Sequence, residues 1–251
     1  MKNIFYIFLF ISQVFFAQTG FEKGNDLYKD GKYELAIEAY ESVLKTNKES
    51  AELYFNLGNC YYKLQKTAPA IYNYEKALVL DPDNAAALNN IKFAQKRTID
   101  EIKVIPKVGF AKLLRDFTAI YSFDGWAYIS VGLAVVFLLL FIGYYFSQTV
   151  LSKRIFFVSM FILLLLVLMS VAVAFFEKNH FDNERIAIVF AEAAEVKSEP
   201  QNGSNSIFTL HEGTKVYVEE SLEGWKKIEL TDGTEGWIES SAIKEVKEFK
   251  N

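Results

Sequence analysis

Two long apolar runs without a charged residue constrain the fold of this chain more than any other feature. They are Trp126–Phe146 and Ile155–Phe176. At 1.5 Å per residue each run forms a helix about 30 Å long, which matches the hydrocarbon thickness of a bilayer. Helices buried in soluble proteins rarely run this long without a polar face. The two runs therefore predict two transmembrane helices, joined as a hairpin in the lipid bilayer by the short loop 147–154.

Composition limits what the rest of the chain can do. The 251 residues are 51% hydrophobic, carry a net charge of -4, and include one cysteine and two histidines. A negative charge argues against a nucleic-acid partner. So few cysteines and histidines leave no disulfide scaffold, zinc site or nucleophile–base pair, and no glycine-rich phosphate loop is present. We therefore expect a membrane protein with soluble parts, and with no catalytic residues, no metal and no cofactor.

The segment 1–17 has the layout of a secretory signal peptide. Lys2 precedes the uncharged run Ile4–Phe16, which is too short for a membrane span. We expect cleavage after Ala17; the alternative is a retained anchor helix. An exported amino terminus followed by a hairpin places both soluble regions in the periplasm, at a bacterial inner membrane, and places the loop 147–154 in the cytoplasm. The basic residues that flank the hairpin do not settle this orientation by themselves.

The segment before the first span has the pattern of a helix that lies on a membrane surface. Its apolar residues have helical spacing and fall on one face: Phe110, Leu113, Leu114, Phe117 and Ile120. We therefore assign residues 104–124 to an amphipathic surface helix and its linker. Residues 177–186, which follow the second span, are assigned to a second linker.

The sequence between the expected signal peptide and the first apolar run contains an internal repeat. Its period equals the offset from Gly24 to Gly58. Five further pairs coincide at this offset: Tyr28 with Tyr62, Ala36 with Ala70, Ile37 with Ile71, Tyr40 with Tyr74 and Leu44 with Leu78. The two segments resemble the tetratricopeptide repeat, a helix–turn–helix unit of the same length. The resemblance implies that glycine and alanine stand where helices cross closely. Residues 18–103 are therefore expected to form an all-α array of two repeats and a capping helix.

The first helix of each repeat lines the concave groove of such an array, and residues three or four apart on it point to the same side. The partner-binding residues predicted by this rule are Asn25, Tyr28, Lys29, Phe55, Asn59, Tyr62, Lys63 and Lys96. The amides suit the backbone of an extended peptide, and the lysines suit a carboxylate or an acidic tail. As surface amides, the asparagines are expected to contribute little to stability. The alternative is that the tyrosines only pack between helices and the lysines serve solubility.

The C-terminal region 187–251 has a β pattern. Five runs alternate apolar and polar residues: 187–190, 207–210, 214–219, 224–230 and 236–238. Turn signals such as Asp232-Gly233 separate them. Five short strands predict a small all-β barrel, and the pairs Gly224-Trp225 and Gly236-Trp237 make the region resemble the bacterial SH3-type fold. Trp225 and Trp237 have two interpretations: they fill the core, or they form an exposed platform for a wall peptide, a glycan or a protein.

Taken in order, these parts resemble a known family. A signal peptide, a short tetratricopeptide array, a surface helix, a two-span hairpin and a terminal SH3-like barrel make the chain similar to the BatE proteins of the Bacteroidetes aerotolerance operon. The resemblance lies in the order of the domains more than in a signature motif. It implies partners encoded alongside: membrane proteins with von Willebrand factor A domains, a BatD-like protein and a MoxR-type ATPase in the cytoplasm. It also implies a role in oxidative or envelope stress.

Two functions of different classes follow from the sequence. The first is a non-enzymatic scaffold in the inner membrane that binds protein partners through the repeat array, in a Bat-type aerotolerance or envelope-stress complex. The second is an envelope sensor or anchor whose barrel binds peptidoglycan. A scaffold is expected to co-purify with integral membrane proteins, whereas a wall receptor is expected to sediment with isolated cell walls.

Overall fold

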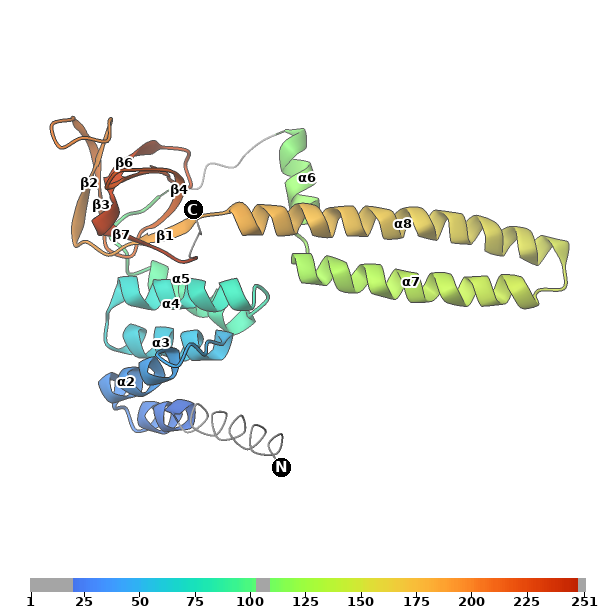
Figure 1. Ribbon diagram of the computed structural model, residues 1–251, viewed down its shortest axis with the longest axis horizontal. Coiled ribbons are helices and arrows are strands. Elements are labelled where there is room, and N and C mark those ends of the chain that lie inside the picture. The colour runs from blue at the N-terminus through green and yellow to red at the C-terminus, as the bar shows by residue number, and fades with distance from the viewer. Residues whose placement is uncertain (1–19, 103–108, 248–251) are drawn as a thin grey trace, which may run out of the picture. The chain divides into compact units, whose positions relative to one another are not determined.

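The structure is a computed structural model that describes residues 20–102 and 109–247 (Figure 1). The expected signal peptide, residues 1–17, lies outside the described residues. The chain divides into two compact units. One unit is Pro106–Glu184, and the other combines the segment that ends at Ile105 with the segment that begins at Arg185. The latter unit is therefore built from two separate stretches of the sequence. Pro106–Glu184, which we call the inserted unit, lies between them in the sequence.

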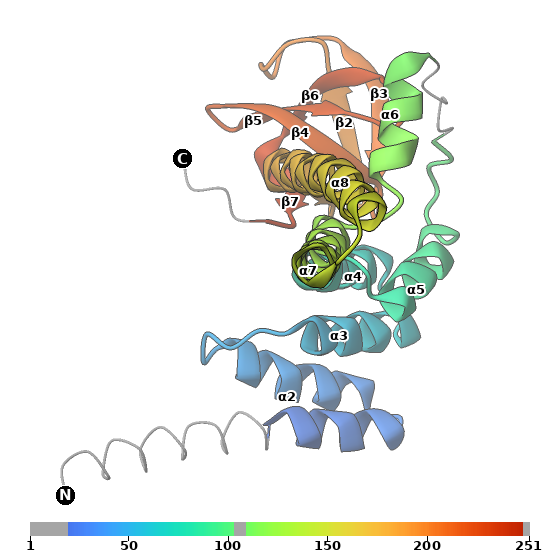
Figure 2. The ribbon, with the colours of Figure 1, turned by 90° about the vertical axis from the view of Figure 1, so that its right-hand side faces the viewer.

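The repeat region consists of helices stacked side by side (Figure 2). In the described part they cover residues 20–29, Tyr33–Leu44 (α2), Ala51–Lys63 (α3), Thr67–Leu80 (α4) and Ala85–Gln95 (α5). Side-chain caps fix two of the helix starts, because the Ser50 hydroxyl accepts the Leu53 N–H at 3.1 Å and the Asn84 side-chain carbonyl accepts the Ala87 N–H at 3.0 Å. The all-α array predicted from the sequence period is confirmed.

Glycines allow the paired helices to cross closely. A Cβ atom added to Gly24 would lie 2.4 Å from the ring of Tyr40, and one added to Gly58 would lie 2.6 Å from the ring of Tyr74. Both tyrosines are buried, so their rings have little room to move aside. The glycines therefore stand where the tetratricopeptide resemblance implied close crossings.

The C-terminal region forms one antiparallel sheet that curls into a barrel (Figure 2). Its strands are Ile186–Val189 (β1), Ala193–Lys197 (β2), Ser206–His211 (β3), Lys215–Leu222 (β4), Trp225–Glu229 (β5), Glu235–Glu239 (β6) and Ile243–Glu245 (β7), in the order β3-β2-β6-β5-β4-β1-β7. A 3-10 turn, Ser240–Ala242 (η1), precedes β7. The predicted all-β barrel is confirmed. Its core is lined by buried aliphatic residues that include Val196, Val216, Ile228 and Ile238.

Two of these strands were not among the five that the sequence predicted. β2 does alternate, with Ala194 and Val196 buried and their neighbours more exposed, but its apolar side chains are small and give a weak signal. β7 is a very short strand. Each strand is positioned by its neighbours in the sheet, β2 by β3 and β7 by β1, and such contacts are not visible in local sequence.

In its described part, the inserted unit consists of three helices: Phe110–Thr118 (α6), Phe123–Phe146 (α7) and Val150–Asn183 (α8). In the described part of the chain, α7 and α8 are the helices long and apolar enough to cross a membrane. They pack along each other, and the buried hydroxyls of Ser130 and Ser170 lie 2.8 Å apart between them.

α8 corrects two expected boundaries. It begins at Val150, inside the expected loop 147–154, and it continues to Asn183, through most of the expected linker 177–186. The Thr149 hydroxyl caps its start by accepting the Ser152 N–H at 3.2 Å. At its end, Lys178 pairs with Asp182 one turn later at 3.0 Å. Polar residues end an apolar run but not a helix, so hydropathy located the apolar run and not the ends of the helix.

The short helix α6 is fastened to the rest of the inserted unit. The Arg115 guanidinium donates to both carboxylate oxygens of Glu177, at 2.8 and 2.9 Å, although the Glu177 side chain is only 9% exposed. The indole N–H of Trp126 donates to the Thr118 carbonyl oxygen at 2.8 Å. Within the segment 104–124, which was assigned to a surface helix and its linker, the helix is α6, and it ends at Thr118 before α7 begins.

The barrel packs directly on the last helices of the repeat array. A continuous apolar cluster contains Ile71 of α4 and Ile91 of α5 together with Ile186 and Ile188 of β1. A partly buried ion pair adds to it, because Lys215 Nζ lies 2.8 Å from the carboxylate of Glu75. An array of this type needs a final element to cover its last apolar face. Here α5 does so only in part, and strand β1 covers the remainder.

Candidate partner-binding face of the repeat array

The asparagines predicted to face a partner belong to a hydrogen-bonded ladder that repeats with the sequence. The Asn25 carbonyl oxygen accepts the Tyr40 hydroxyl at 2.7 Å and the Asn56 amide at 3.0 Å. One repeat later, the Asn59 carbonyl oxygen accepts the Tyr74 hydroxyl at 2.8 Å and the Asn90 amide at 2.8 Å. Each asparagine therefore joins the two helices of its own repeat to the first helix of the next.

This ladder contradicts the expectation that the two asparagines contribute little to stability. Tyr40 and Tyr74 are buried, and burial raises the pKa of both phenols, so each hydroxyl stays protonated and needs an acceptor. Asn25 and Asn59 supply that acceptor through their carbonyl oxygens. Only the amide N–H groups of these side chains remain to meet a partner, since no bond from either group is found among the described residues.

The predicted aromatic residues pack between helices as well as reaching the surface. Tyr28 makes an edge contact with Tyr33 at 5.3 Å between ring centroids, and burial raises its pKa. Phe55 lies 6.0 Å from the Tyr74 ring. All three of Tyr28, Phe55 and Tyr62 are partly buried against the helical cores. The packing role that the sequence left open is therefore present, and a binding role would use only the exposed part of each ring.

The cations on the first helices follow the same period. Lys29 and Lys63 are exposed at equivalent positions, and Lys29 forms an ion pair with the exposed Asp26, at 3.4 Å. The third position in this series is Arg97, just after α5. Its guanidinium stacks on the Tyr62 ring at 3.8 Å and donates to the Tyr62 carbonyl oxygen at 3.0 Å. We call Lys29, Lys63 and Arg97 the cationic row.

Lys96, which was predicted to complete the face, is exposed and lies over the ring of Phe93 at 5.5 Å. Phe93 is itself half exposed, at 48%, and occupies the position of Asn25 and Asn59 in the third unit. The sequence interpretation missed Asn56, Asn90, Phe93 and Arg97. The repeat offset identifies all four. Asn56 and Asn90 are one period apart, Phe93 lies one period after Asn59, and Arg97 lies one period after Lys63.

The two tryptophans of the barrel do not belong to its core cluster. In the register of β5 and β6, Ile228 pairs with Gly236, and Lys227 pairs with Trp237. Trp225 and Trp237 therefore share the face opposite to Ile228, because side chains alternate along a strand. Trp225 is only 9% exposed, and the Lys197 ammonium lies over its ring at 5.5 Å. Trp237 is more accessible than Trp225.

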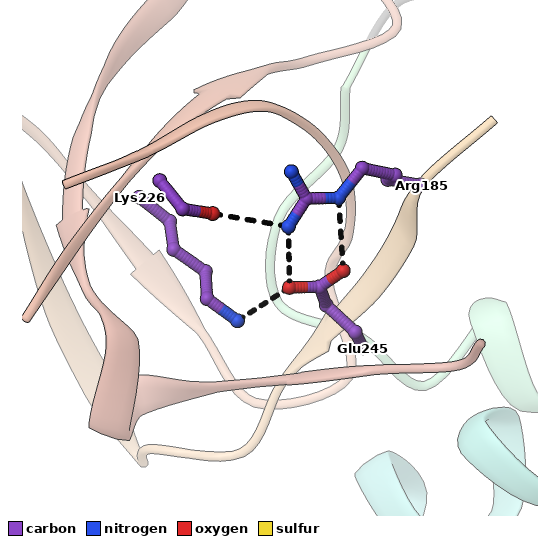
Figure 3. Close-up of polar contacts among 4 residues, drawn as sticks. Arg185, Lys226 and Glu245 are labelled. Carbon is purple, nitrogen blue, oxygen red and sulfur yellow. Dashed lines mark hydrogen bonds and ion pairs between the residues drawn. The ribbon is translucent and has the colours of Figure 1, made fainter. Parts of the chain in front are cut away.

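Arg185 fixes the point at which the chain leaves the inserted unit and enters the barrel (Figure 3). Its guanidinium donates to both carboxylate oxygens of Glu245, at 3.1 and 2.9 Å, and to the Ser221 hydroxyl at 3.0 Å. Lys226 bonds to the same carboxylate at 2.5 Å. Burial alone would raise the pKa of Glu245, but the bonds and charges of Arg185 and Lys226 hold it below its usual value.

Asp100 fixes the point at which the chain leaves the repeat array. Its carboxylate accepts the backbone N–H of His211 at 2.7 Å and the hydroxyl of Thr214 at 2.6 Å, and it lies 2.7 Å from Nδ1 of His211. Burial opposes the charge on Asp100, but these bonds outweigh it and lower its pKa. Shortly after it, Ile102 packs on the barrel core. Both chain segments that border the inserted unit are thus held by the barrel.

Comparison with known proteins supports the same two domains. The tetratricopeptide repeat family matches residues 21–85, and the bacterial SH3 domain family matches residues 192–244. The inserted unit lies between these two matches.

Among curated proteins, the chain is similar to sperm-associated antigen 1 of Mus musculus, at 39% identity over 75 residues, or 30% of this chain and 8% of that protein. It is 38% identical over 61 residues to the Hsp70-Hsp90 organizing protein of Triticum aestivum, covering 24% of this chain and 10% of that protein. It is 44% identical over 64 residues to the mitochondrial import receptor subunit TOM34 of Pongo abelii, covering 25% of this chain and 20% of that protein. The chain thus spans a fifth or less of the length of these relatives, and the likeness concerns a module within them.

Proposed function

We propose that this protein is a non-enzymatic membrane scaffold that binds protein partners through the exposed face of its repeat array. The observation that carries the proposal is the cationic row, in which three consecutive units present Lys29, Lys63 and Arg97 at equivalent positions. Amide N–H groups of Asn25 and Asn59 lie one helical turn from the two lysines on the same helices. Together they suit an extended acidic segment of another protein, since donors and positive charges alternate along its path.

The comparisons support a role in protein binding. The tetratricopeptide match covers the helices that carry Lys29 and Lys63. Two of the similar proteins are, by their names, an organizing protein and an import receptor subunit, so each handles other proteins. For this chain we infer the partners that the BatE resemblance implies, namely membrane proteins with von Willebrand factor A domains and a BatD-like protein, in an aerotolerance or envelope-stress complex.

Charge reversal of the row tests the proposal. Lys29→Glu together with Lys63→Glu is expected to reduce co-purification of membrane partners from detergent extract at least tenfold, at unchanged expression. The matched control is Lys45→Glu with Lys66→Glu, which reverses two exposed lysines at the end of α2 and the start of α4. Equal recovery of partners by the two double variants would refute the proposal.

The packing of the barrel on the array supports one topology for the proposed hairpin. Two domains that share an apolar core must lie on the same side of a membrane, and an inserted pair of spans permits this. We place that side in the periplasm of a bacterial inner membrane, because of the signal-like amino terminus. Cysteines at Ser50 and Ser204 are expected to react with an impermeant thiol reagent in spheroplasts, and one at Ser152 is not. Labelling only at Ser152 would reverse the orientation.

A second candidate function is anchoring to peptidoglycan through the barrel. The register of β5 and β6 favours it, because Trp225 and Trp237 share a face outside the core, and the bacterial SH3 match agrees. Trp237→Ala is expected to abolish sedimentation of the protein with isolated cell walls while the thermal midpoint stays unchanged. If the parent protein does not sediment with cell walls, this candidate function is excluded. It is also excluded if the Trp237→Ala variant sediments as much as the parent does.

A further inference from the structure

Strands β2 and β6 separate after a single pairing position. In the described sheet they pair only at Lys197 with Trp237, whereas β5 and β6 pair at five positions. Beyond that position the two strands enclose a hollow of about 370 Å³. The hollow is closed at its far end by the turn before β2 and by η1, because the Phe190 and Ala191 N–H groups donate to the Ala242 carbonyl oxygen at 2.8 and 3.3 Å. These hydrogen bonds fix the shape of the gap between β2 and β6.

The size and lining of this hollow suit an extended peptide with small side chains. Its floor is formed by the buried Ala194 and Ile238, and its sides include Ala191, Ala193 and Ala242. A volume of a few hundred Å³ is at the lower end for ligand sites. An additional strand can lie between two diverging strands and use their backbone groups. Alanine walls leave width for the backbone of such a strand and for methyl groups, but not for large side chains.

The rim of the hollow is negatively charged. Glu195 and Glu239 both line it and are exposed. Lys197 also lines it, but its ammonium group donates to the Asn202 carbonyl oxygen at 2.8 Å and lies over the Trp225 ring. Within residues 20–102 and 109–247, neither Glu195 nor Glu239 forms an ion pair, and the one bond to Glu239 is a long one, 3.4 Å, from Ser241. The two carboxylates are thus available to a cationic group.

We propose that the hollow between β2 and β6 binds a short extended peptide of small residues, with its free amino group held between the carboxylates of Glu195 and Glu239. This site is distinct from the cationic row, which attracts acidic segments, and it includes neither tryptophan of the barrel. It therefore gives the barrel a ligand of opposite charge to the one proposed for the repeat array. The protein would hold an acidic partner and an amino-terminal peptide through different domains.

The test uses the full-length protein in detergent micelles and two probes, trialanine amide and N-acetyl-trialanine amide, titrated by saturation-transfer NMR of the peptide. Trialanine amide is expected to bind at least tenfold more tightly than the acetylated peptide, because acetylation removes the positive charge. In the Glu195→Gln, Glu239→Gln variant this preference is expected to vanish. Equal binding of the two peptides to the parent protein would overturn the proposal.

A second pair of variants locates the site. Ala193→Trp fills the hollow and is expected to abolish binding of trialanine amide, whereas Ser206→Trp, on the exposed edge strand β3, is expected to bind as the parent does. Trileucine amide is expected to bind at least tenfold more weakly than trialanine amide, because its side chains exceed the width of the hollow. Retained binding by the folded Ala193→Trp variant would overturn the placement. The double glutamine variant changes only exposed side chains, so it provides the test if Ala193→Trp fails to fold.

Discussion

Asn25 and Asn59 show how one side chain serves packing and recognition through different atoms. Each carbonyl oxygen is used inside the array, by a buried tyrosine and by the next asparagine of the ladder. Each amide N–H pair remains for a partner. The sequence located both residues through their spacing, but it assigned the whole side chain to the surface. Spacing identifies a position in the repeat, whereas the use of each polar atom depends on which side chain of another helix lies opposite.

The ladder predicts a measurable loss of stability. Asn59→Ala removes the acceptor of the fully buried Tyr74 hydroxyl and is expected to cost about 1–3 kcal/mol of unfolding free energy. The measurement is urea denaturation of the full-length protein, followed by far-ultraviolet circular dichroism. Asn89→Ala, at an exposed position of α5, is the control and is expected to change stability by less than about 0.5 kcal/mol. An Asn59→Ala variant as stable as the control would show that the ladder contributes nothing.

Helices and strands differ in how far the sequence alone could define them. The repeat period located the helices of the array, and the two apolar runs located α7 and α8, because both signals are local and long. The ends of α8 were missed, since a helix can continue past the last residue of its apolar run. Strands β2 and β7 were missed because they are short, and pairing partners far along the chain hold them in place. Long periodic elements are thus encoded locally, whereas short ones depend on tertiary contacts.

The helix α6 depends on one such contact and provides a test at this scale. Arg115→Ala leaves the nearly buried Glu177 carboxylate without its bidentate partner, which disfavours the packed position of α6. Limited proteolysis of the protein in micelles is expected to cleave within Phe110–Thr118 at least fivefold faster than in the parent. Lys112→Ala, an exposed position on the same helix, is expected to be cleaved at the parental rate. Equal rates for the two variants would mean that the ion pair does not hold α6.

At the scale of the whole molecule, the repeat array and the barrel form one folded unit although the whole of Pro106–Glu184 separates them in sequence. Their shared apolar cluster is supported by the partly buried ion pair of Glu75 with Lys215 and by the bonds of Asp100 to β3 and the following turn. The sequence predicted both domains but not their contact. Ile71 and Ile91 look like ordinary core residues of a repeat, and only the structure shows that β1 covers them.

The contact predicts a specific dependence on pH. The folded pKa of Asp100 is lowered, so its contribution to stability is fully present above its unfolded value of about 3.9 and is lost as the pH falls through the lower folded value. Asp100→Asn is expected to be less stable than the parent at pH 7 and to lose less stability between about pH 5 and pH 2. Denaturation midpoints across this range give the measurement. Glu212→Gln, at an exposed position, is the control and is expected to follow the curve of the parent protein. An Asp100→Asn curve parallel to the parent curve would contradict the role assigned to Asp100.

The order of the segments along the chain also sets the timing of folding during synthesis. The strand that covers Ile71 and Ile91 begins at Ile186, after the whole inserted unit has been made. At about 5–20 residues per second, the ribosome needs on the order of 4–16 s to complete that unit. Throughout this interval the newly made array exposes an apolar face that its own helices cannot cover, while the two long apolar helices are being made. The nascent protein therefore passes through a stage at which this apolar face is uncovered, and that stage ends when β1 packs on the array.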